Sequence, residues 1–193
     1  MKIINILTKE FNSPNGIAFL FPLVKFKREF FESEIDINFF YDYKDYRLYE
    51  CNILILDYRA FYTDFKPSFL SFIKILNQKK KNLDKVIFYD NSDSTGTIVD
   101  EVFEFVDVYL KNQVLKDKSL YSKKIYGARV YTDFYHKKFK INDKDIIHQK
   151  PLNKKDIKKI RVGWNSGLCD YSFSSVYKQL FIKHFKNYNA LKL

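Results

Sequence analysis

Residues 89–97, YDNSDSTGT, bring two carboxylates, several hydroxyls and a glycine together in one short segment. The carboxylates of Asp90 and Asp93 could act as general bases or accept hydrogen bonds from sugar hydroxyls. The residues that follow are small ones that cap helices and let a backbone approach a phosphate: Ser94, Thr95, Gly96 and Thr97. The segment predicts a loop that binds a phosphate or a sugar, although ordinary helix capping would use the same residues.

A second polar segment, NSPNG at residues 12–16, follows the first predicted strand. It ends in Asn15 and Gly16, which could form the other side of the same cleft. The segment lacks the terminal Gly-Lys-Ser/Thr of a Walker loop and the three spaced glycines of a dinucleotide-binding loop. A plain loop before a helix would also account for it.

Other reactive side chains have simpler explanations. His136 lies near Asp133, an arrangement that could transfer protons, but a surface or packing role is the ordinary one. Trp164 is the only tryptophan, and we expect it to pack. Neither the three histidines nor the two cysteines have the spacing of a metal site, so we expect no bound metal.

The polar segments need a scaffold that gathers strand ends, and the hydrophobic pattern predicts one. Apolar, β-branched runs predict five strands, at residues 1–8, 35–41, 51–58, 85–90 and 106–112. Helical patterns lie between them at residues 17–33, 67–82 and 98–105, with Pro22 as a candidate kink. This alternation predicts a doubly wound, Rossmann-like α/β fold, with a mostly parallel sheet of about five or more strands and helices on both faces. Ligands bind such sheets at the carboxyl ends of the strands, where both polar segments lie.

The chain is expected to divide into a sheet domain and a different carboxyl-terminal part. The amino-terminal domain spans residues 1–150 and includes a basic, aromatic extension from about residue 113. Residues 151–193 are expected to form a linker and an amphipathic helix at 171–188, and could lead to a second domain.

The formal net charge of +11 belongs to the second half of the chain. Residues 1–100 hold 14 Lys or Arg and 14 Asp or Glu, so residues 101–193 carry the whole excess. A basic segment can meet phosphates, nucleic acid or an anionic membrane, or it can be a solvated lysine-rich face. No apolar run reaches the roughly 20 residues that cross a bilayer, so we expect a cytoplasmic protein that could lie peripherally on the inner face of a membrane.

Four motifs, taken in order, resemble bacterial glycosyltransferases of surface-polysaccharide biosynthesis, which build lipopolysaccharide or capsule. They are IFYDNSDST, VDVYLKNQVLKDKSLY, YGARVYTDFYH and VGWNSGLCDYS, and they cover roughly residues 50–172. The resemblance implies the GT-B architecture, in which two Rossmann-like domains face a cleft. It makes this chain the amino-terminal, acceptor-side domain.

The resemblance also implies partners and residue roles. A nucleotide-sugar would be the donor substrate, and a saccharide or lipid-linked molecule the acceptor. A carboxyl-terminal domain or a partner chain would bind most of the donor, because the family's donor-binding positions have no counterpart in these residues. Transfer would need no metal, since helix dipoles and basic side chains can stabilise the leaving diphosphate. Asp90 or Asp93 would be the base, while Lys111 and Arg129 would supply positive charge.

Two other functions fit parts of the sequence. Asp57 ends the third predicted strand and Lys111 the fifth, as the phosphoacceptor and lysine do in response-regulator receivers; the acidic pair after the first strand is reduced to Glu10. The aromatic and basic residues of 120–140 would fit a nucleic-acid-binding module, but no recognised motif accompanies them and we expect no nucleic acid partner.

Overall fold

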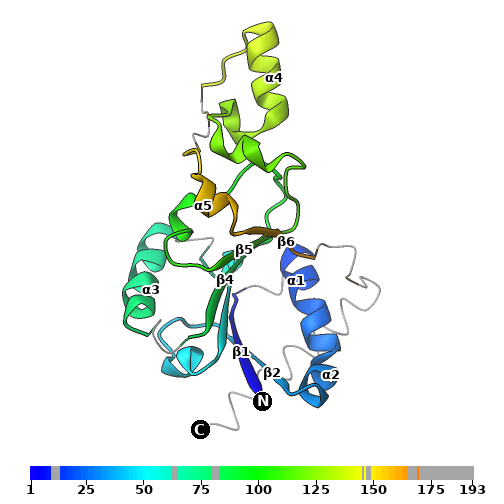
Figure 1. The fold of residues 1–193 in the computed structure, drawn as a ribbon, viewed down its shortest axis with the longest axis vertical. Coiled ribbons are helices and arrows are strands. Elements are labelled where there is room, and N and C mark those ends of the chain that lie inside the picture. Colours follow the sequence, from blue (N-terminus) through cyan, green and yellow to red (C-terminus); the bar gives the residue numbers. More distant parts are fainter. Residues whose placement is uncertain are drawn as a thin grey trace.

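The computed structural model describes residues 1–9, 14–61, 65–79, 83–144, 146, 149–164 and 169. Within these residues, six strands form one sheet in which every pair is parallel (Figure 1). The strands are β1 (Lys2–Leu7), β2 (Ile35–Phe40), β3 (Ile53–Asp57), β4 (Lys85–Asp90), β5 (Val108–Lys111) and β6 (Ile160–Val162). The structure thus confirms the doubly wound α/β fold, and the first five strands match the predicted runs to within two residues at each end.

The strand order is β2-β1-β3-β4-β5-β6. The chain winds outward from β1 to β2 and then in the opposite direction from β3 onward, so the direction of winding reverses between β1 and β3. In open α/β sheets, ligands bind outside the carboxyl ends of the strands at such a switch point. The order therefore places the candidate site at the carboxyl edge of the sheet.

Helices cover both faces of the sheet (Figure 1). On one face lie α1 (Pro14–Lys25) and α2 (Lys27–Glu32), and on the other lies α3 (Phe65–Lys79). The other helices of the described residues are short or lie beyond the sheet: η1 (Tyr46–Tyr49), η2 (Tyr58–Phe61), η4 (Asp100–Val102), η5 (Lys118–Ser122), η6 (Tyr126–Ala128), α4 (Val130–Phe139) and α5 (Lys154–Ile157).

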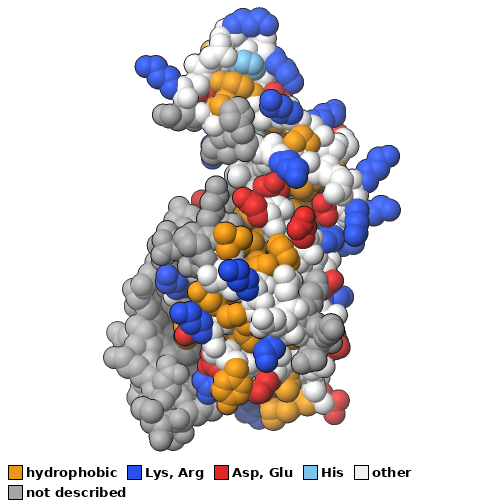
Figure 2. Space-filling model, turned by 90° about the vertical axis from the view of Figure 1, so that its left-hand side faces the viewer, with side chains coloured by type: hydrophobic (Ala, Val, Ile, Leu, Met, Phe, Trp, Pro, Cys, Tyr) orange, Lys and Arg blue, Asp and Glu red, His pale blue; other side chains and the backbone are white. Residues whose placement is uncertain are grey.

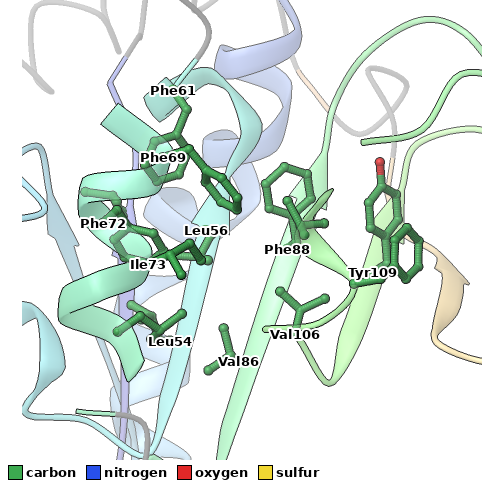
Figure 3. Close-up of a cluster of buried hydrophobic side chains, with 14 of the residues drawn as sticks. Leu54, Leu56, Phe61, Phe69, Phe72, Ile73, Val86, Phe88, Val106 and Tyr109 are labelled. Atoms are coloured by element: carbon green, nitrogen blue, oxygen red, sulfur yellow. The ribbon is translucent and has the colours of Figure 1, made fainter. Parts of the chain in front are cut away.

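The alternation of side chains along each strand supplies one apolar layer to each face. On the α3 face, Leu54 and Leu56 of β3 pack with Val86 and Phe88 of β4 (Figure 3). Phe69, Phe72 and Ile73 of α3 close this layer. On the other face, the layer consists of Ile6, Ile37, Ile55 and Tyr89 from the strands and of Phe19, Leu20 and Leu23 from α1. Burying each of these large side chains contributes about 1.5–3 kcal/mol, so the two layers fix the sheet between its helices.

The predicted helix at 98–105 is wrong: this segment forms only the 3-10 helix η4. Two backbone N–H groups that would begin a helix bond side chains from elsewhere instead, Ile98 N–H to Gln149 Oε1 at 2.8 Å and Val99 N–H to the Tyr109 hydroxyl at 3.0 Å. Ile98, Val102 and Phe103 are buried in the α3-face core. Core packing and these side-chain bonds therefore override the local helical pattern.

The predicted helix at 17–33 is divided into α1 and α2 at Phe26, one turn after Pro22. The expected linker contains an element of the sheet, because β6 pairs with β5 and Leu152 is buried in the core. The predicted helix at 171–188 lies outside the described residues.

Between β5 and β6 the chain makes a long excursion. Residues 118–144, which we call the arm, carry η5, η6 and α4, and α4 projects beyond the sheet at the top of Figure 1. The basic, aromatic extension predicted from the sequence is thus an insertion between two neighbouring strands.

Candidate functional site at the carboxyl edge of the sheet

Polar side chains end four neighbouring strands, and all of them are buried. Each is at most 1% exposed: Thr8 after β1, Asp57 on β3, Asp90 and Asn91 at the end of β4, and Lys111 on β5. The apolar runs of the strands carry these groups into the interior, where each needs hydrogen-bond partners to offset the loss of water. They form two networks, one on each face of the sheet.

The first network centres on Asp57, which continues the face of Ile53 and Ile55 on β3. The Thr8 hydroxyl donates to Asp57 Oδ2 at 2.7 Å, and the Asn91 amide donates to Asp57 Oδ1 at 2.9 Å. The Arg59 backbone N–H also donates to Oδ1, at 3.0 Å. The network therefore links the carboxyl ends of β1, β3 and β4.

Burial raises the pKa of Asp57 to about 6, even though hydrogen bonds from Thr8, Arg59 and Asn91 and the Arg59 charge oppose this effect. Desolvation outweighs these effects because the carboxylate lies wholly out of water. Asp57 is therefore a weaker acid than an ordinary aspartic acid, with a pKa of about 6.

The second network centres on Asp90, on the α3 face. The Tyr109 hydroxyl and Lys111 Nζ both donate to Asp90 Oδ2, at 2.6 and 2.7 Å. The Ser92 backbone N–H donates to Oδ1 at 2.9 Å, and Lys111 Nζ also reaches the Ser92 hydroxyl at 3.1 Å. Burial and the Asp90 carboxylate raise the pKa of Tyr109 well above its usual value, so its phenol remains a donor.

This geometry changes the expectation for Asp90 and Lys111. The Asp90 side chain is 1% exposed and the Lys111 side chain 0% exposed, and the two form an ion pair. The Lys111 charge is therefore neutralised by Asp90. A ligand phosphate could reach Lys111 only if this pair opened. Both residues therefore hold the loop after β4 in place rather than facing the solvent.

Asp93, by contrast, lies at the surface and contacts the other predicted segment. The Asn15 side-chain amide donates to Asp93 Oδ1 at 2.6 Å, joining residues 78 positions apart in the chain. Asn15 lies in the first turn of α1 beside Gly16, which is buried. The structure thus brings together the two segments that the sequence analysis placed on opposite sides of a cleft.

The remaining residues of the loop after β4 bond mainly to one another and to the arm. The Ser94 hydroxyl oxygen accepts from the Thr97 hydroxyl at 2.9 Å and from the Thr97 N–H at 3.2 Å. The Tyr121 hydroxyl donates to the Thr95 carbonyl at 2.5 Å. A Cβ on Gly96 would lie 2.4 Å from the Ala128 carbonyl oxygen. The close backbone approach expected at Gly96 therefore occurs with the chain's own arm, and no α-helix follows the loop to be capped.

Arg129 is exposed and lies at the start of α4. Its guanidinium donates to the Tyr131 hydroxyl at 2.6 Å and lies 5.9 Å from the centre of that ring. Its contacts place the side chain on the arm, while its backbone passes beside Gly96.

Trp164 and His136 both pack, as the simpler explanation predicted. Trp164 stacks on Phe19 with ring centres 5.5 Å apart, and its indole N–H donates to the Phe19 carbonyl at 3.0 Å. The Tyr89 hydroxyl donates to the Trp164 carbonyl. His136 stacks on Tyr126 with ring centres 3.8 Å apart.

Sequence reasoning missed Thr8, Asn91 and Tyr109 as parts of the two networks. For Tyr109 a signal existed: residues 109 and 111 share one face of β5, and in the parallel register Lys111 is the partner of Asp90. For Thr8 and Asn91 no such signal exists, because their roles depend on the spatial order β1-β3-β4 rather than on spacing in the chain.

No family model matches the chain, and neither a curated protein nor a solved structure does. Among the described residues, no group of three or more His, Cys, Asp or Glu side chains could hold a metal ion. No helix in that part of the chain has the length and apolarity needed to span a membrane.

Proposed function

We propose that this chain is the amino-terminal, acceptor-side part of a GT-B-type glycosyltransferase that transfers a sugar from a nucleotide-sugar to a polysaccharide or lipid-linked acceptor. The observation that carries the proposal is the Asn15–Asp93 hydrogen bond, which joins the start of α1 to the loop after β4. These groups lie at the sheet edge where open α/β proteins bind ligands. The proposed reaction, sugar transfer, comes from the resemblance of the four sequence motifs to glycosyltransferases.

The surface and the interior of this edge have different roles in the proposal. Asp93 and Asn15 are the groups that meet the acceptor: a carboxylate and an amide at the surface can bind sugar hydroxyls, and Asp93 can orient or deprotonate the attacking one. Asp90 does not contact the acceptor in this proposal. With Lys111 and Tyr109 it fixes the backbone of the loop that carries Asp93, so it is a positioning residue.

The donor belongs to a different part of the enzyme. A second Rossmann-like domain, in the same polypeptide or in a partner chain, would bind the nucleotide-sugar across a cleft from this edge. Helix dipoles and basic side chains would stabilise the leaving diphosphate, so the proposed transfer needs no metal.

Acceptor binding by matched variants tests this proposal. Saccharide and lipid-linked acceptors in detergent are titrated against the natural chain and against Asp93→Asn, with calorimetry as the readout. The control is Asp84→Asn, which alters a similar exposed amide–carboxylate pair, Asn52–Asp84, on another loop. We expect Asp93→Asn to weaken binding about ten-fold or more and Asp84→Asn to leave it unchanged. If no acceptor binds, or if Asp93→Asn binds as tightly as the natural chain, the proposed site is wrong.

A receiver-like regulatory role is a second candidate, because the order β2-β1-β3-β4-β5 is also that of receiver domains and Asp57 ends β3. However, Asp57 is 0% exposed and Lys111 bonds to Asp90 instead. Incubation with acetyl phosphate and Mg²⁺, followed by mass spectrometry, separates the two functions. Phosphorylation at Asp57 would favour the receiver, and an unmodified Asp57 would argue against it.

A further inference from the structure

The surface of α4 has the reverse of the usual amphipathic arrangement. The residues with more polar side chains face the protein: Asp133 Oδ1 accepts from the Tyr126 N–H at 3.0 Å, and His136 stacks on Tyr126. Thr132 lies where a Cβ on Gly127 would come within 2.9 Å of it. The helix therefore packs on η6 through its polar half, and none of its residues is buried.

The other half of α4 is apolar and exposed. At 100° per residue, its large side chains cover one continuous half of the helix circumference. They are 44–58% exposed and comprise Val130, Tyr131, Phe134, Tyr135 and Phe139, with Ile141 just beyond the helix at 49%. A soluble helix normally turns such a face toward a core. On α4 this face is exposed instead.

Positive charge surrounds this apolar face. The arm holds eight Lys or Arg and two Asp, a formal excess of six positive charges in residues 118–144. Lys138 lies within the apolar half itself, with Nζ 5.3 Å from the centre of the Phe134 ring and 5.2 Å from that of Phe139. Figure 2 shows lysine and arginine side chains around apolar ones at the end of the molecule that carries the arm. A surface that accepts aromatic rings and presents negative charge at the same place would complement this face.

We propose that the arm docks on an anionic lipid surface through the exposed half of α4. Aromatic rings favour the boundary between headgroups and acyl chains, and lysines beside them bind lipid phosphates. The short helix would lie in the plane of the membrane surface with its polar half still packed on η6. This inference depends on the surface of the arm alone and not on the proposed acceptor site at Asn15 and Asp93.

An oligonucleotide fits the arm less well. Nucleic-acid surfaces that bind single strands combine a basic groove with aromatic platforms. Helix α4 projects from the rest of the molecule (Figure 1). Several of its aromatic rings contact one another: Tyr135 stacks on Phe139 with ring centres 5.9 Å apart. A projecting apolar face suits a fluid surface into which it can insert.

Vesicle co-sedimentation of the full chain tests the inference. We expect binding to mixed phosphatidylglycerol–phosphatidylcholine vesicles, little binding to pure phosphatidylcholine, and weakening as salt screens the charges. Lys138→Gln with Lys140→Asn should weaken binding about five-fold per charge removed. Serine at Phe134, Tyr135 and Phe139 together should weaken it by more than about ten-fold.

Two matched controls test whether any loss of an exposed charge or aromatic ring weakens vesicle binding. Lys74→Gln removes an exposed charge on α3, and Phe31→Ser removes an aromatic ring that is 57% exposed on α2. Neither should change vesicle binding. If either control weakens binding as much as the α4 variants do, the proposed docking face is wrong.

A second variant tests the inference even if the triple serine variant does not fold. Phe134→Trp adds an indole to the exposed face, and brominated lipids quench an indole that enters the membrane. We expect quenching in this variant and none in the natural chain, whose single tryptophan, Trp164, packs on Phe19. Absence of quenching at Phe134→Trp would overturn the inference. So would salt-sensitive binding of an oligonucleotide, or dimer formation through the arm, without vesicle binding.

Discussion

At the scale of single residues, the carboxyl edge of the sheet holds two buried carboxylates, Asp57 and Asp90. Different groups compensate each of them for the loss of water. Asp90 forms an ion pair with Lys111, whereas Asp57 accepts hydrogen bonds from Thr8, Asn91 and the Arg59 backbone N–H and also lies near the Arg59 charge. Desolvation disfavours the charged form of a carboxylate unless nearby groups compensate for it. The two sites should therefore respond differently to substitution.

The stability of the chain should fall between about pH 4 and pH 6 because of Asp57. Its pKa is about 6 in the folded chain and 3.8 ordinarily, so between these values the folded state binds more protons than the unfolded state. The free energy of unfolding then decreases as the pH rises, by on the order of 3 kcal/mol from this group alone. Urea unfolding across this range measures the slope.

Asp57→Asn should remove that part of the slope. The amide can keep the bonds from Asn91 and Arg59 through its oxygen and donate its N–H to the Thr8 hydroxyl oxygen, so the network survives without a charge. Asp84→Asn, at an exposed position, serves as the control. An unchanged slope in Asp57→Asn would contradict the assigned cause.

The Asp90–Lys111 pair should show strong coupling. Lys111→Met alone leaves the Asp90 carboxylate buried without its cation and should destabilise the chain by about 3–5 kcal/mol. Lys111→Met combined with Asp90→Asn should recover a large part of this loss, because no buried charge remains. Denaturant unfolding of the single and double variants gives the coupling energy.

The matched control for this cycle is the exposed pair Arg28–Glu32, whose side chains are 88% and 58% exposed. Removing one partner there should change stability hardly at all. Additive effects of the Asp90 and Lys111 substitutions would mean that the buried pair does not act as a unit.

At the scale of elements, the loop after β4 is held from three directions. Asp90 and Tyr109 fix its root on the sheet, Asn15 reaches it from α1, and Tyr121 and Ala128 hold it from the arm. Of these contacts, only the one with Asn15 lies at the surface. The loop is therefore a junction between the sheet and the arm, and its contact with α1 is the part that solvent reaches.

Gly96→Ala should loosen this junction. The added methyl group would lie 2.4 Å from the Ala128 carbonyl oxygen, a backbone atom that can move only with η6. We expect a loss of about 1–3 kcal/mol of stability, typical of overpacking, measured by denaturant unfolding. Thr95→Ala is the control, because it alters the preceding side chain and keeps the carbonyl that Tyr121 binds. Equal stability of Gly96→Ala and the natural chain would show that the arm is not seated on this glycine.

The secondary-structure elements were predicted best where the sequence shows a single clear hydrophobic pattern. The apolar runs of β1 to β5 specify buried parallel strands, and their ends were located well. Residues 98–105 have a helical pattern but use Ile98 and Val102 to fill the core, which no local pattern reveals. β6 has three residues, and its pairing with β5 depends on the return of the chain from the arm.

The candidate site was predictable only in part, for a related reason. The polar residue types after β1 and β4 indicated which loops lie at the edge, and Asn15 and Asp93 do meet there. Which carboxylate is buried depends on strand parity and register: Asp90 lies opposite Lys111, while Asp93 lies beyond the strand. Spacing in the chain cannot separate these two environments without the order of the strands.

At the scale of the whole molecule, the sheet and the arm should differ in local stability. β4 lies in the middle of the sheet with buried side chains on both faces, whereas α4 has no buried residue. Amide hydrogen exchange should therefore be slowest in β4 and fastest, among the longer helices described, in α4. Mass spectrometry of peptic fragments measures both. Equal protection of α4 and β4 would show that the arm is part of the same cooperative unit.

The position of β6 at the sheet edge also has a consequence for synthesis on the ribosome. About fifty residues separate the end of β5 from the end of β6, so at the usual rate of elongation β6 emerges roughly 3–10 s after β5. During that interval the nascent chain can assemble β1 to β5, but the outer backbone groups of β5 have no neighbouring strand. An unpaired edge is a template for pairing with other chains. The newly made protein would therefore pass through a period in which a chaperone could protect it from aggregation, and this period ends when β6 pairs with β5.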